Sequence, residues 1–305
     1  MKNRKSGLLY GLCFWTILLG FSAYVLLDTF VISREITTVS ATQASGQVSS
    51  TSSSDATADG TYTDTSYTDD NISITIETKT IDDTQVYIAD VTISDASYLK
   101  TALAKDTFGT NVTETTSAQA EDKGAILAIN GDYYGANKTG YVIKNGTIYR
   151  DSVRSDSGYD DLVIYEDGSF GIINETEISA EELVENGVTQ LLAFGPTLVE
   201  NGEIAVDQST EVGKAMASNP RTAIGMIDDL HYIIVVADGR SSQSQGLSLY
   251  GLAQVMQDYG CVTAYNLDGG GSSTMYFNGQ VINNPTTNGS TFKEREVSDI
   301  VYIGY

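Results

Sequence analysis

Four Asn-Gly or Asp-Gly pairs restrict the fold of this chain more than any other feature, because each pair lies between two apolar-rich runs. Such pairs adopt the backbone torsions of a tight turn easily and are the strongest short-range signal for a β-hairpin. They are found at 145–146, 167–168, 201–202 and 278–279. The chain is therefore expected to form a mostly antiparallel sheet.

Other segments refine this expectation. The runs 72–77 and 86–93 are rich in β-branched residues and are predicted to be consecutive strands. Ser179-Ala-Glu-Glu182 is a capping box that opens a short helix ending at Gly187. A second helix is predicted from Ser248 to a stop at Gly260, with apolar residues at i, i+3, i+4 and i+7, and a third over 97–105. Strands and helices do not alternate regularly, so the predicted class is α+β rather than a doubly wound sheet.

The N-terminus resembles a membrane anchor. Three of the first five residues are basic, and residues 7–27 then run for 21 positions without a charge. About 20 apolar residues cross the hydrocarbon core of a bilayer. We therefore expect one transmembrane helix, with the N-terminus in the cytoplasm and the remainder outside the cell. The length and terminal position argue against a buried core helix, whereas cleavage near Ser40 or Ala41 stays an open alternative.

A stalk is predicted between the anchor and the folded domain. Half of residues 37–70 are Ser or Thr, none is Lys or Arg, and the segment has no sustained apolar pattern. The expected division is a cytoplasmic tip and anchor over 1–36, a disordered stalk over 37–70 and one domain over 71–305. Only Cys261 lies outside the anchor, so the domain cannot form an internal disulfide. An exported domain of this size without a disulfide favours the cell membrane of a Gram-positive bacterium.

Charge and composition exclude several classes of function. The chain has 17 Lys and Arg against 40 Asp and Glu, a net charge of −23, so nucleic acid is not expected as a partner. Two Cys and one His are too few for the usual zinc, haem or iron–sulfur sites. We expect no required cofactor; oxygen ligands could hold Ca²⁺, but no motif supports such a site. Because the single His231 opens a predicted strand, acid–base catalysis would fall to carboxylates.

Residues whose side chains could bind a ligand or take part in catalysis follow the ends of several predicted strands. Each has a structural alternative: an Asn and a Gly that only shape a turn, an Arg in a surface ion pair, a solvated turn, or a flexible glycine linker. For the segment that contains Asn130 and Asp132, the residues alone favour the structural turn over a functional role. In chain order the candidates are Asn130, Asp132, Arg221, Thr222, Asp238, Arg240, Asp268, Gly269, Gly270, Gly271, Ser272, Ser273 and Arg295.

The glycine triplet at 269–271 carries the most specific pattern. It lies between an acid and two hydroxyls, where backbone amides can approach an anion closely. It is not a P-loop, since no Lys follows the glycines and a strand is predicted next. Arg221 and Arg240 are suited to bidentate contacts with phosphate, and Asp132, Asp238 and Asp268 supply acid–base groups. Cations beside carboxylates fit cleavage of a negatively charged sugar derivative.

Six segments together resemble the phosphodiester glycosidase family, which contains the animal lysosomal uncovering enzyme and bacterial proteins associated with exopolysaccharide. The segments are 128–135, 194–202, 219–225, 235–240, 246–279 and 295–303, and the sequence NLDGGGSST within the fifth is the most specific. The resemblance implies a hydrolase that cleaves a sugar-1-phosphodiester in a surface glycan or glycopolymer and releases the sugar from a phosphomonoester. It also implies that all the candidate residues above line one pocket, with Arg295 as the weaker assignment. As proton-transfer residue we rank Asp268 first, Asp238 second and Asp132 third.

Two other functions stay open at this point. A membrane-tethered binding or assembly factor for anionic exopolysaccharide or cell-wall polymer could use the same pocket without catalysis. The three acids argue against it, because a binder gains nothing from acids beside a phosphate. An ordinary retaining glycosidase needs two carboxyl groups about 5 Å apart and leaves the arginines and glycines unexplained. The sugar, the bond that breaks, the oligomeric state and any metal are not determined by the sequence.

Overall fold

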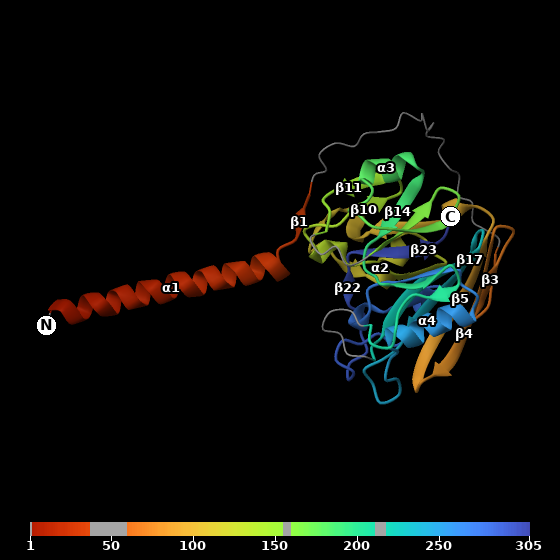
Figure 1. Ribbon diagram of the computed structural model, residues 1–305. Helices are drawn as coiled ribbons and strands as arrows, with labels where there is room; N and C mark the ends of the chain where they lie inside the picture. Colours follow the sequence, from red (N-terminus) through yellow and green to blue (C-terminus); the bar gives the residue numbers. More distant parts are fainter. Residues whose placement is uncertain (1, 37–59, 155–159, 211–217) are drawn as a thin grey trace.

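A nine-stranded antiparallel sheet forms the centre of the protein in the computed structural model, which describes residues 2–36, 60–154, 160–210 and 218–305 (Figure 1). All the strand pairs within these ranges are antiparallel. The strands, in spatial order, are β16 (Glu203–Ile204), β15 (Thr197–Glu200), β19 (Thr263–Asn266), β17 (Arg221–Asp228), β18 (His231–Ala237), β5 (Thr84–Ile93), β4 (Ile72–Ile81), β3 (Ser66–Thr68) and β2 (Thr61–Tyr62).

A five-stranded sheet packs against the nine-stranded one. Its strands in spatial order are β21 (Gln280–Val281), β20 (Met275–Phe277), β9 (Leu127–Asn130), β23 (Asp299–Ile303) and β6 (Leu99–Leu103). A three-stranded sheet contains β13 (Phe170–Ile173), β12 (Asp161–Tyr165) and β14 (Val188–Leu192). Three pairs complete the strands: β10 (Val142–Lys144) with β11 (Thr147–Arg150), β8 (Glu114–Thr115) with β22 (Glu296–Val297), and β1 (Arg34–Glu35) with β7 (Gly109–Thr110).

The four predicted hairpins are all present. Each Asn-Gly or Asp-Gly pair connects two adjacent antiparallel strands, namely β10–β11, β12–β13, β15–β16 and β20–β21. At Asn145, Asn201 and Asn278, and at the glycine after each, φ is positive. The turn residues therefore adopt the conformation that selects for Asn and Gly, and the prediction of a mostly antiparallel α+β fold is confirmed.

Two of the predicted helices are confirmed and one is wrong. In α3 (Ala180–Glu185) the Ser179 side chain caps the amide of Glu182, and in α4 (Leu249–Asp258) Ser248 caps Gly251. Residues 97–105 are instead β6 between two short 3-10 turns, η1 (Ala96–Tyr98) and η2 (Ala104–Asp106), because β6 pairs along its whole length with β23. The sequence analysis missed α2 (Thr116–Asp122), which Thr115 caps. The other 3-10 turns are η3 (Tyr134–Ala136) and η4 (Gly270–Ser272).

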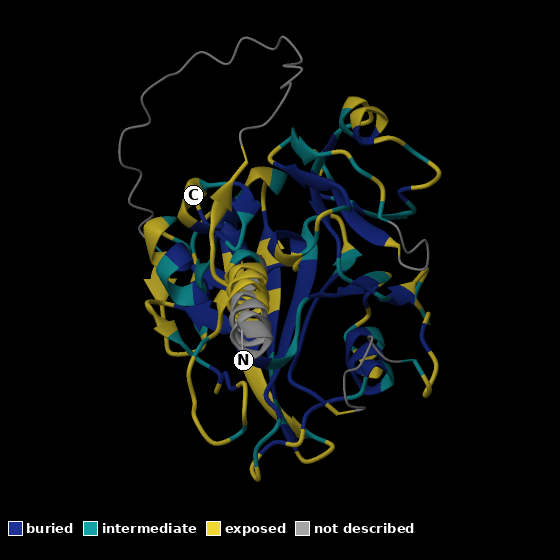
Figure 2. Cartoon of the chain, turned by 90° about the vertical axis from the view of Figure 1, so that its left-hand side faces the viewer, coloured by how far each residue is buried: buried dark blue, intermediate teal, exposed yellow. Residues whose placement is uncertain are grey.

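The central strands β17 and β18 of the nine-stranded sheet are buried on both faces, which explains their apolar sequences, whereas one face of β4 is exposed. In β18, Ile234 and Val236 face the five-stranded sheet, where they join Leu127 and Val301 in one core. The alternate residues of β18 face α4 and pack with Leu252 in a second core. α2 covers the far side of the five-stranded sheet, and α3 covers the three-stranded sheet. The domain is thus layered, and buried residues concentrate in the strands (Figure 2).

The N-terminal region differs from the prediction in two respects. α1 (Lys2–Phe30) projects from the rest of the fold (Figure 1), but no helix within the described residues has both the length and the apolar character for a membrane crossing. The predicted transmembrane anchor is therefore not supported. The predicted stalk lies outside the described residues over 37–59. Its last part is structured, because β2 and β3 pair within the nine-stranded sheet, so the domain begins before residue 71.

Candidate active site

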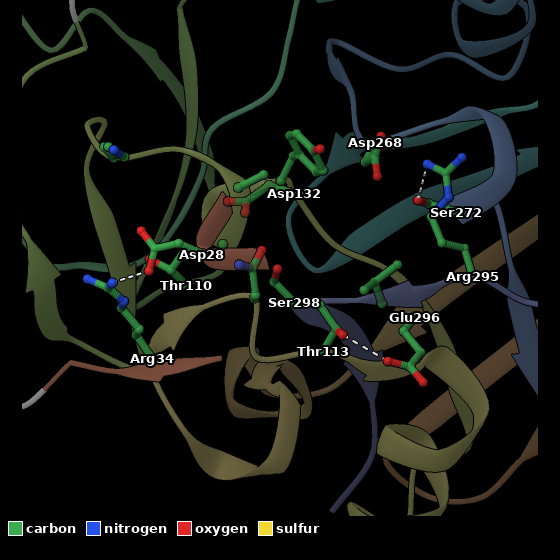
Figure 3. Close-up of a pocket in the computed structure, with 16 residues that line it drawn as sticks. Asp28, Arg34, Thr110, Thr113, Asp132, Asp268, Ser272, Arg295, Glu296 and Ser298 are labelled. Carbon is green, nitrogen blue, oxygen red and sulfur yellow. Dashed lines mark hydrogen bonds and ion pairs between the residues drawn. The ribbon is translucent and has the colours of Figure 1, made fainter. Parts of the chain in front are cut away.

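A cavity of about 530 Å³ opens where loops from both large sheets meet the N-terminal segment. Figure 3 shows Asp268, Ser272 and Arg295 on one side of it and Asp28 with Arg34 on the other. Arg34 donates to Asp28 across that second wall. The residues that line the cavity are Asp28, Arg34, Thr110, Asn111, Thr113, Asp132, Tyr133, Gly135, Ala136, Lys138, Asp268, Ser272, Arg295, Glu296, Val297 and Ser298.

Asp132 follows β9 and is held on all sides, although it borders the cavity. Its Oδ1 accepts a hydrogen bond from the Tyr134 amide at 2.8 Å, and its Oδ2 accepts one from the Ala193 amide at 3.0 Å. The ammonium of Lys144 lies 3.6 Å from Oδ2. Both oxygens therefore accept hydrogen bonds from main-chain amides, and Oδ2 also faces a cation.

Asp268 follows β19 and lies in a different environment. Burial raises its pKa to about 6, although the hydrogen bond from Ser272 and the charge of Arg295 oppose this rise. The negative charge of Asp132 also acts on it in the raising direction, which shows that the two carboxyl groups are neighbours. One cavity therefore contains two carboxyl groups in different environments, one with a pKa raised to about 6 and one held by amide hydrogen bonds and an ammonium.

Asn130 and Thr222 are near the cavity but behind its surface. Both are fully buried, and Thr222 Oγ1 donates to Asn130 Oδ1 at 2.9 Å. Asn130 Nδ2 donates to the carbonyl oxygen of Asp268 at 2.6 Å, and its Oδ1 accepts from the Thr274 amide at 3.2 Å. Their polar atoms thus hold the loops that carry Asp132 and Asp268, so the predicted substrate contacts are replaced by a positioning role.

The glycine triplet is packed against arginines. A Cβ on Gly270, whose φ is +64°, would lie 2.9 Å from Arg240 Nη2. A Cβ on Gly271 would lie 2.4 Å from Thr287 Oγ1 and 2.8 Å from Arg295 Nη2. The glycines therefore permit two guanidinium groups to approach the main chain.

The amides of this loop are less available than predicted. The Gly270 amide donates to Pro220, the Ser272 amide to Gly269, and the Ser273 amide to Gly270. These three N–H groups are used inside the protein, so they do not form the expected anion nest. Anion binding at this edge would rest on Arg295, which lines the cavity. Arg240 lies beside Arg295 but does not line the cavity, and its guanidinium donates to Asn219 Oδ1 and to the carbonyl oxygen of Thr287.

Arg221 and Asp238 do not line this cavity. Arg221 is 3% exposed, and its Nε donates to the carbonyl oxygen of Leu247 at 3.0 Å. Asp238 accepts hydrogen bonds at 2.9–3.1 Å from the amide of Asn284 and from the side chains of Asn283 and Asn284. Both residues join neighbouring loops to the sheet, and the second rank that we gave Asp238 as a proton-transfer residue has no support in this geometry.

Two functional candidates were missed by the sequence analysis. Lys144 and Asp299 are buried behind Asp132, and their charged atoms are 2.7 Å apart. A lysine at the end of the apolar strand Val142–Lys144 and an acid that opens the apolar strand Asp299–Ile303 were the available signals. Within the described residues, no group of three or more His, Cys, Asp or Glu side chains is arranged to hold a metal ion.

Comparisons with known proteins give consistent matches. The phosphodiester glycosidase family matches residues 123–304. An SPbeta prophage-derived uncharacterized protein, YomE of Bacillus subtilis, is 33% identical over 201 residues, which cover 65% of this chain and 31% of that protein. The N-acetylglucosamine-1-phosphodiester alpha-N-acetylglucosaminidase of Mus musculus is 29% identical over 194 residues, 56% of this chain and 35% of the mouse protein. The chain spans about a third of the length of these relatives.

Solved structures share the fold. The catalytic domain of the zebrafish N-acetylglucosamine-1-phosphodiester alpha-N-acetylglucosaminidase, auto-inhibited by its pro-peptide, matches with a TM-score of 0.59 at 24% identity, covering 77% of this chain and 83% of that one. A hypothetical protein from Synechocystis matches with a TM-score of 0.53 at 17% identity, covering 76% of this chain and 62% of that one.

Proposed function

Because this chain belongs to the phosphodiester glycosidase family, we propose that it hydrolyses a sugar-1-phosphodiester linkage and releases the sugar from a phosphomonoester. The mammalian relatives are named for a reaction of this class on N-acetylglucosamine-1-phosphodiesters. The observation that carries the proposal is the pair of carboxyl groups in one cavity, Asp132 and Asp268, whose environments differ, with Arg295 beside them.

The two carboxyl groups take different parts in the proposed reaction. Asp268, in the fraction that is protonated, donates its proton to the phosphate oxygen as the bond from that oxygen to the anomeric carbon breaks. Asp132 activates the attacking water or stabilises the positive charge that develops on the sugar ring. Water supplies the hydroxyl group of the free sugar and releases its other proton to solvent, the phosphomonoester leaves with the proton of Asp268, and Asp268 is protonated again from solvent.

The phosphate is recognised in this proposal by the arginines next to the glycine triplet. Arg295 lines the cavity next to Ser272, and Arg240 lies within reach of the charges of both Arg295 and Asp268. Guanidinium groups bind phosphate oxygens bidentately. Neutral glycosides lack the group that these arginines would bind, so they should be poor substrates.

We propose a glycan or anionic glycopolymer at the outer surface of a Gram-positive cell as the natural substrate. The low cysteine content and the Ser/Thr-rich segment at 37–59 support an extracytoplasmic place for the domain. Since two carboxyl groups suffice for glycoside hydrolysis, we propose that no cofactor is required. Activity that survives dialysis against EDTA is the expected result.

One experiment tests the function directly. The full-length protein is incubated in ¹⁸O-labelled water with a panel of sugar-1-phosphodiesters and with teichoic acid, and the products are analysed by mass spectrometry. Cleavage at the anomeric carbon places ¹⁸O in the sugar, whereas attack at phosphorus places it in the phosphomonoester. Asp268→Asn serves as the inactive control. Tight binding of the substrates without any turnover would instead favour a binding or assembly factor for anionic polymers.

A further inference from the structure

A buried charge cluster lies directly behind the cavity. The side chains of Lys144, Asp132 and Asp299 are only 2%, 1% and 0% exposed. They come from three separate parts of the fold: the end of β10, the loop after β9 and the start of β23. Charged groups are rarely buried this completely unless they are paired. The pairing of these three side chains is therefore part of what holds the fold together at this point.

The ammonium of Lys144 is surrounded by three oxygen atoms. Asp299 Oδ2 lies at 2.7 Å, the carbonyl oxygen of Leu191 at 3.3 Å, and Asp132 Oδ2 at 3.6 Å. Burial alone would lower the pKa of Lys144, but the charges of the two aspartates outweigh it and the pKa is raised. The lysine therefore stays charged, and its charge is directed at Asp132 from the side opposite the cavity.

Asp299 differs from Asp132 in how its oxygens are used. Its Oδ2 accepts from Lys144, whereas its Oδ1 has no partner. The chain leaves space for it, because a Cβ on Gly131 would lie 2.5 Å from the Asp299 carboxyl carbon. Gly131 directly precedes Asp132, and its amide donates to the Asp299 carbonyl oxygen at 2.9 Å. The close approach of β23 to this loop thus fixes the lysine and Asp132 relative to each other.

We propose that Lys144 is a positioning residue for the reaction: it holds the Asp132 carboxylate in place at the cavity wall, while Asp299 anchors the ammonium. This inference rests on the proposed function for the part that Asp132 plays. The other titratable groups whose charges reach Asp132 are Asp268, Tyr134, Tyr265 and Arg150, from the loop after β19, η3, β19 and β11. Of the charges that act on Asp132, only Lys144 is both positive and within 4 Å of its carboxylate in the described residues.

The test uses a double variant, because Lys144→Met alone leaves two buried acids without a counter-charge and is expected to destabilise the protein. Lys144→Met with Asp299→Asn removes the pair as a unit, keeps the side-chain volumes and should fold. We expect it to lose about 10²-fold in kcat/KM, as for other displacements of a catalytic group. The loss should fall on kcat more than on KM, because Arg295 is left in place. Asp299→Asn alone should lose less, and Lys144→Arg, which keeps the positive charge, should retain most of kcat.

A matched control is Lys123→Met. Lys123 is also held by two aspartates, Asp106 and Asp122, but it lies away from the catalytic cavity, so its replacement should leave kcat and KM unchanged. The surroundings of the Asp132 carboxyl are followed independently of activity by its ¹³C NMR chemical shift, with the signal assigned from Asp132→Asn. In the double variant this chemical shift should differ from that of the wild type.

The outcomes separate this inference from the proposed function. A double variant that melts like the wild type and shows the wild-type ¹³C chemical shift for Asp132 would overturn the role of Lys144, whatever its activity. A changed chemical shift in a protein that hydrolyses no sugar phosphodiester would leave Lys144 as the group that holds Asp132 in place and would refute the proposed function instead.

Discussion

The side chain of Asn130 donates a 2.6 Å hydrogen bond to the main-chain carbonyl of Asp268, and this bond joins the two loops that bring carboxyl groups to the cavity. Thr222 and the Thr274 amide bind the opposite end of the same amide group. One fully buried side chain therefore connects β9, β17 and the loop after β19. The distance between the two carboxyl groups depends on this connection rather than on either loop alone.

Replacing Asn130 by Ala should destabilise the protein and impair the reaction together. The change leaves Thr222, the Thr274 amide and the Asp268 carbonyl without a shared partner, and each such buried group costs about 1–3 kcal/mol. We expect a loss of about 3 kcal/mol in the free energy of unfolding in urea. Asn137→Ala is the control, because the Asn137 side chain is only half-buried and donates one 3.3 Å hydrogen bond, to the carbonyl oxygen of Tyr133. Equal stability of the two variants would contradict the connecting role of the Asn130 side chain.

The pH dependence of activity follows from Asp268. As the proton donor it must be protonated, and because burial raises its pKa to about 6, kcat/KM should fall as the pH rises above about 6. Asp268→Asn should remove this alkaline limb and lower kcat by about 10²–10⁴-fold. A variant that keeps the wild-type rate and pH profile would make the role of Asp268 structural.

The same group affects stability in a defined window. The pKa of Asp268 is higher in the folded protein than its ordinary value of about 4, so the folded state holds more protons between about pH 4 and 6. Stability contributed by this group is therefore present at low pH and is lost as the pH rises through 6. Asp268→Asn should melt at a higher temperature than the wild type at pH 8, and the difference should shrink toward pH 4.

Local signals predicted the fold well where one short segment decides the structure. The hairpin turns at Asn145, Asn201 and Asn278, and the helices capped by Ser179 and Ser248, form as expected, since each depends on residues only a few positions apart. Residues 97–105 were assigned wrongly because β6 is stabilised by β23, about 200 residues later in the chain. Pairing at that distance leaves no local pattern in the sequence.

The site was predicted only in part for the same reason. Family resemblance named Asp132, Asp268 and Arg295, and the fold brings all three to one cavity. It could not show that Asn130 is consumed by internal hydrogen bonds. Lys144 was not considered at all, since its partner Asp299 is 155 residues away. Which polar residues face a substrate and which support the loops is decided by packing.

The glycine at position 271 should be essential for the anion site. In Gly271→Ala the new Cβ would lie 2.4 Å from Thr287 Oγ1 and 2.8 Å from Arg295 Nη2, so the arginine must move. We expect a higher KM for phosphodiester substrates with a nearly unchanged melting temperature. Gly304→Ala is the matched control, because its Cβ would meet neighbours only at ordinary contact distances of 3.5 Å or more. An unchanged KM in Gly271→Ala would place the phosphate elsewhere.

Arg295, the weaker assignment from the sequence, and Arg221, the stronger one, should behave in the opposite order. Arg295 lines the cavity and its Nη1 donates to Ser272, whereas Arg221 is buried behind it with its Nε bonded to Leu247. Arg295→Ala should therefore lower kcat/KM for a phosphodiester by the value of a charge-assisted hydrogen bond, about 1.5–3 kcal/mol, and leave unfolding in urea nearly unaffected. Arg295→Lys should recover only part of this loss, because a single ammonium cannot form a bidentate fork.

Arg221→Ala should instead reduce the free energy of unfolding by about 1–3 kcal/mol while KM stays close to the wild-type value. Steady-state kinetics and urea unfolding of the three variants test these two roles. The reverse pattern, with substrate binding lost in Arg221→Ala and retained in Arg295→Ala, would move the phosphate site to the other side of the glycine triplet.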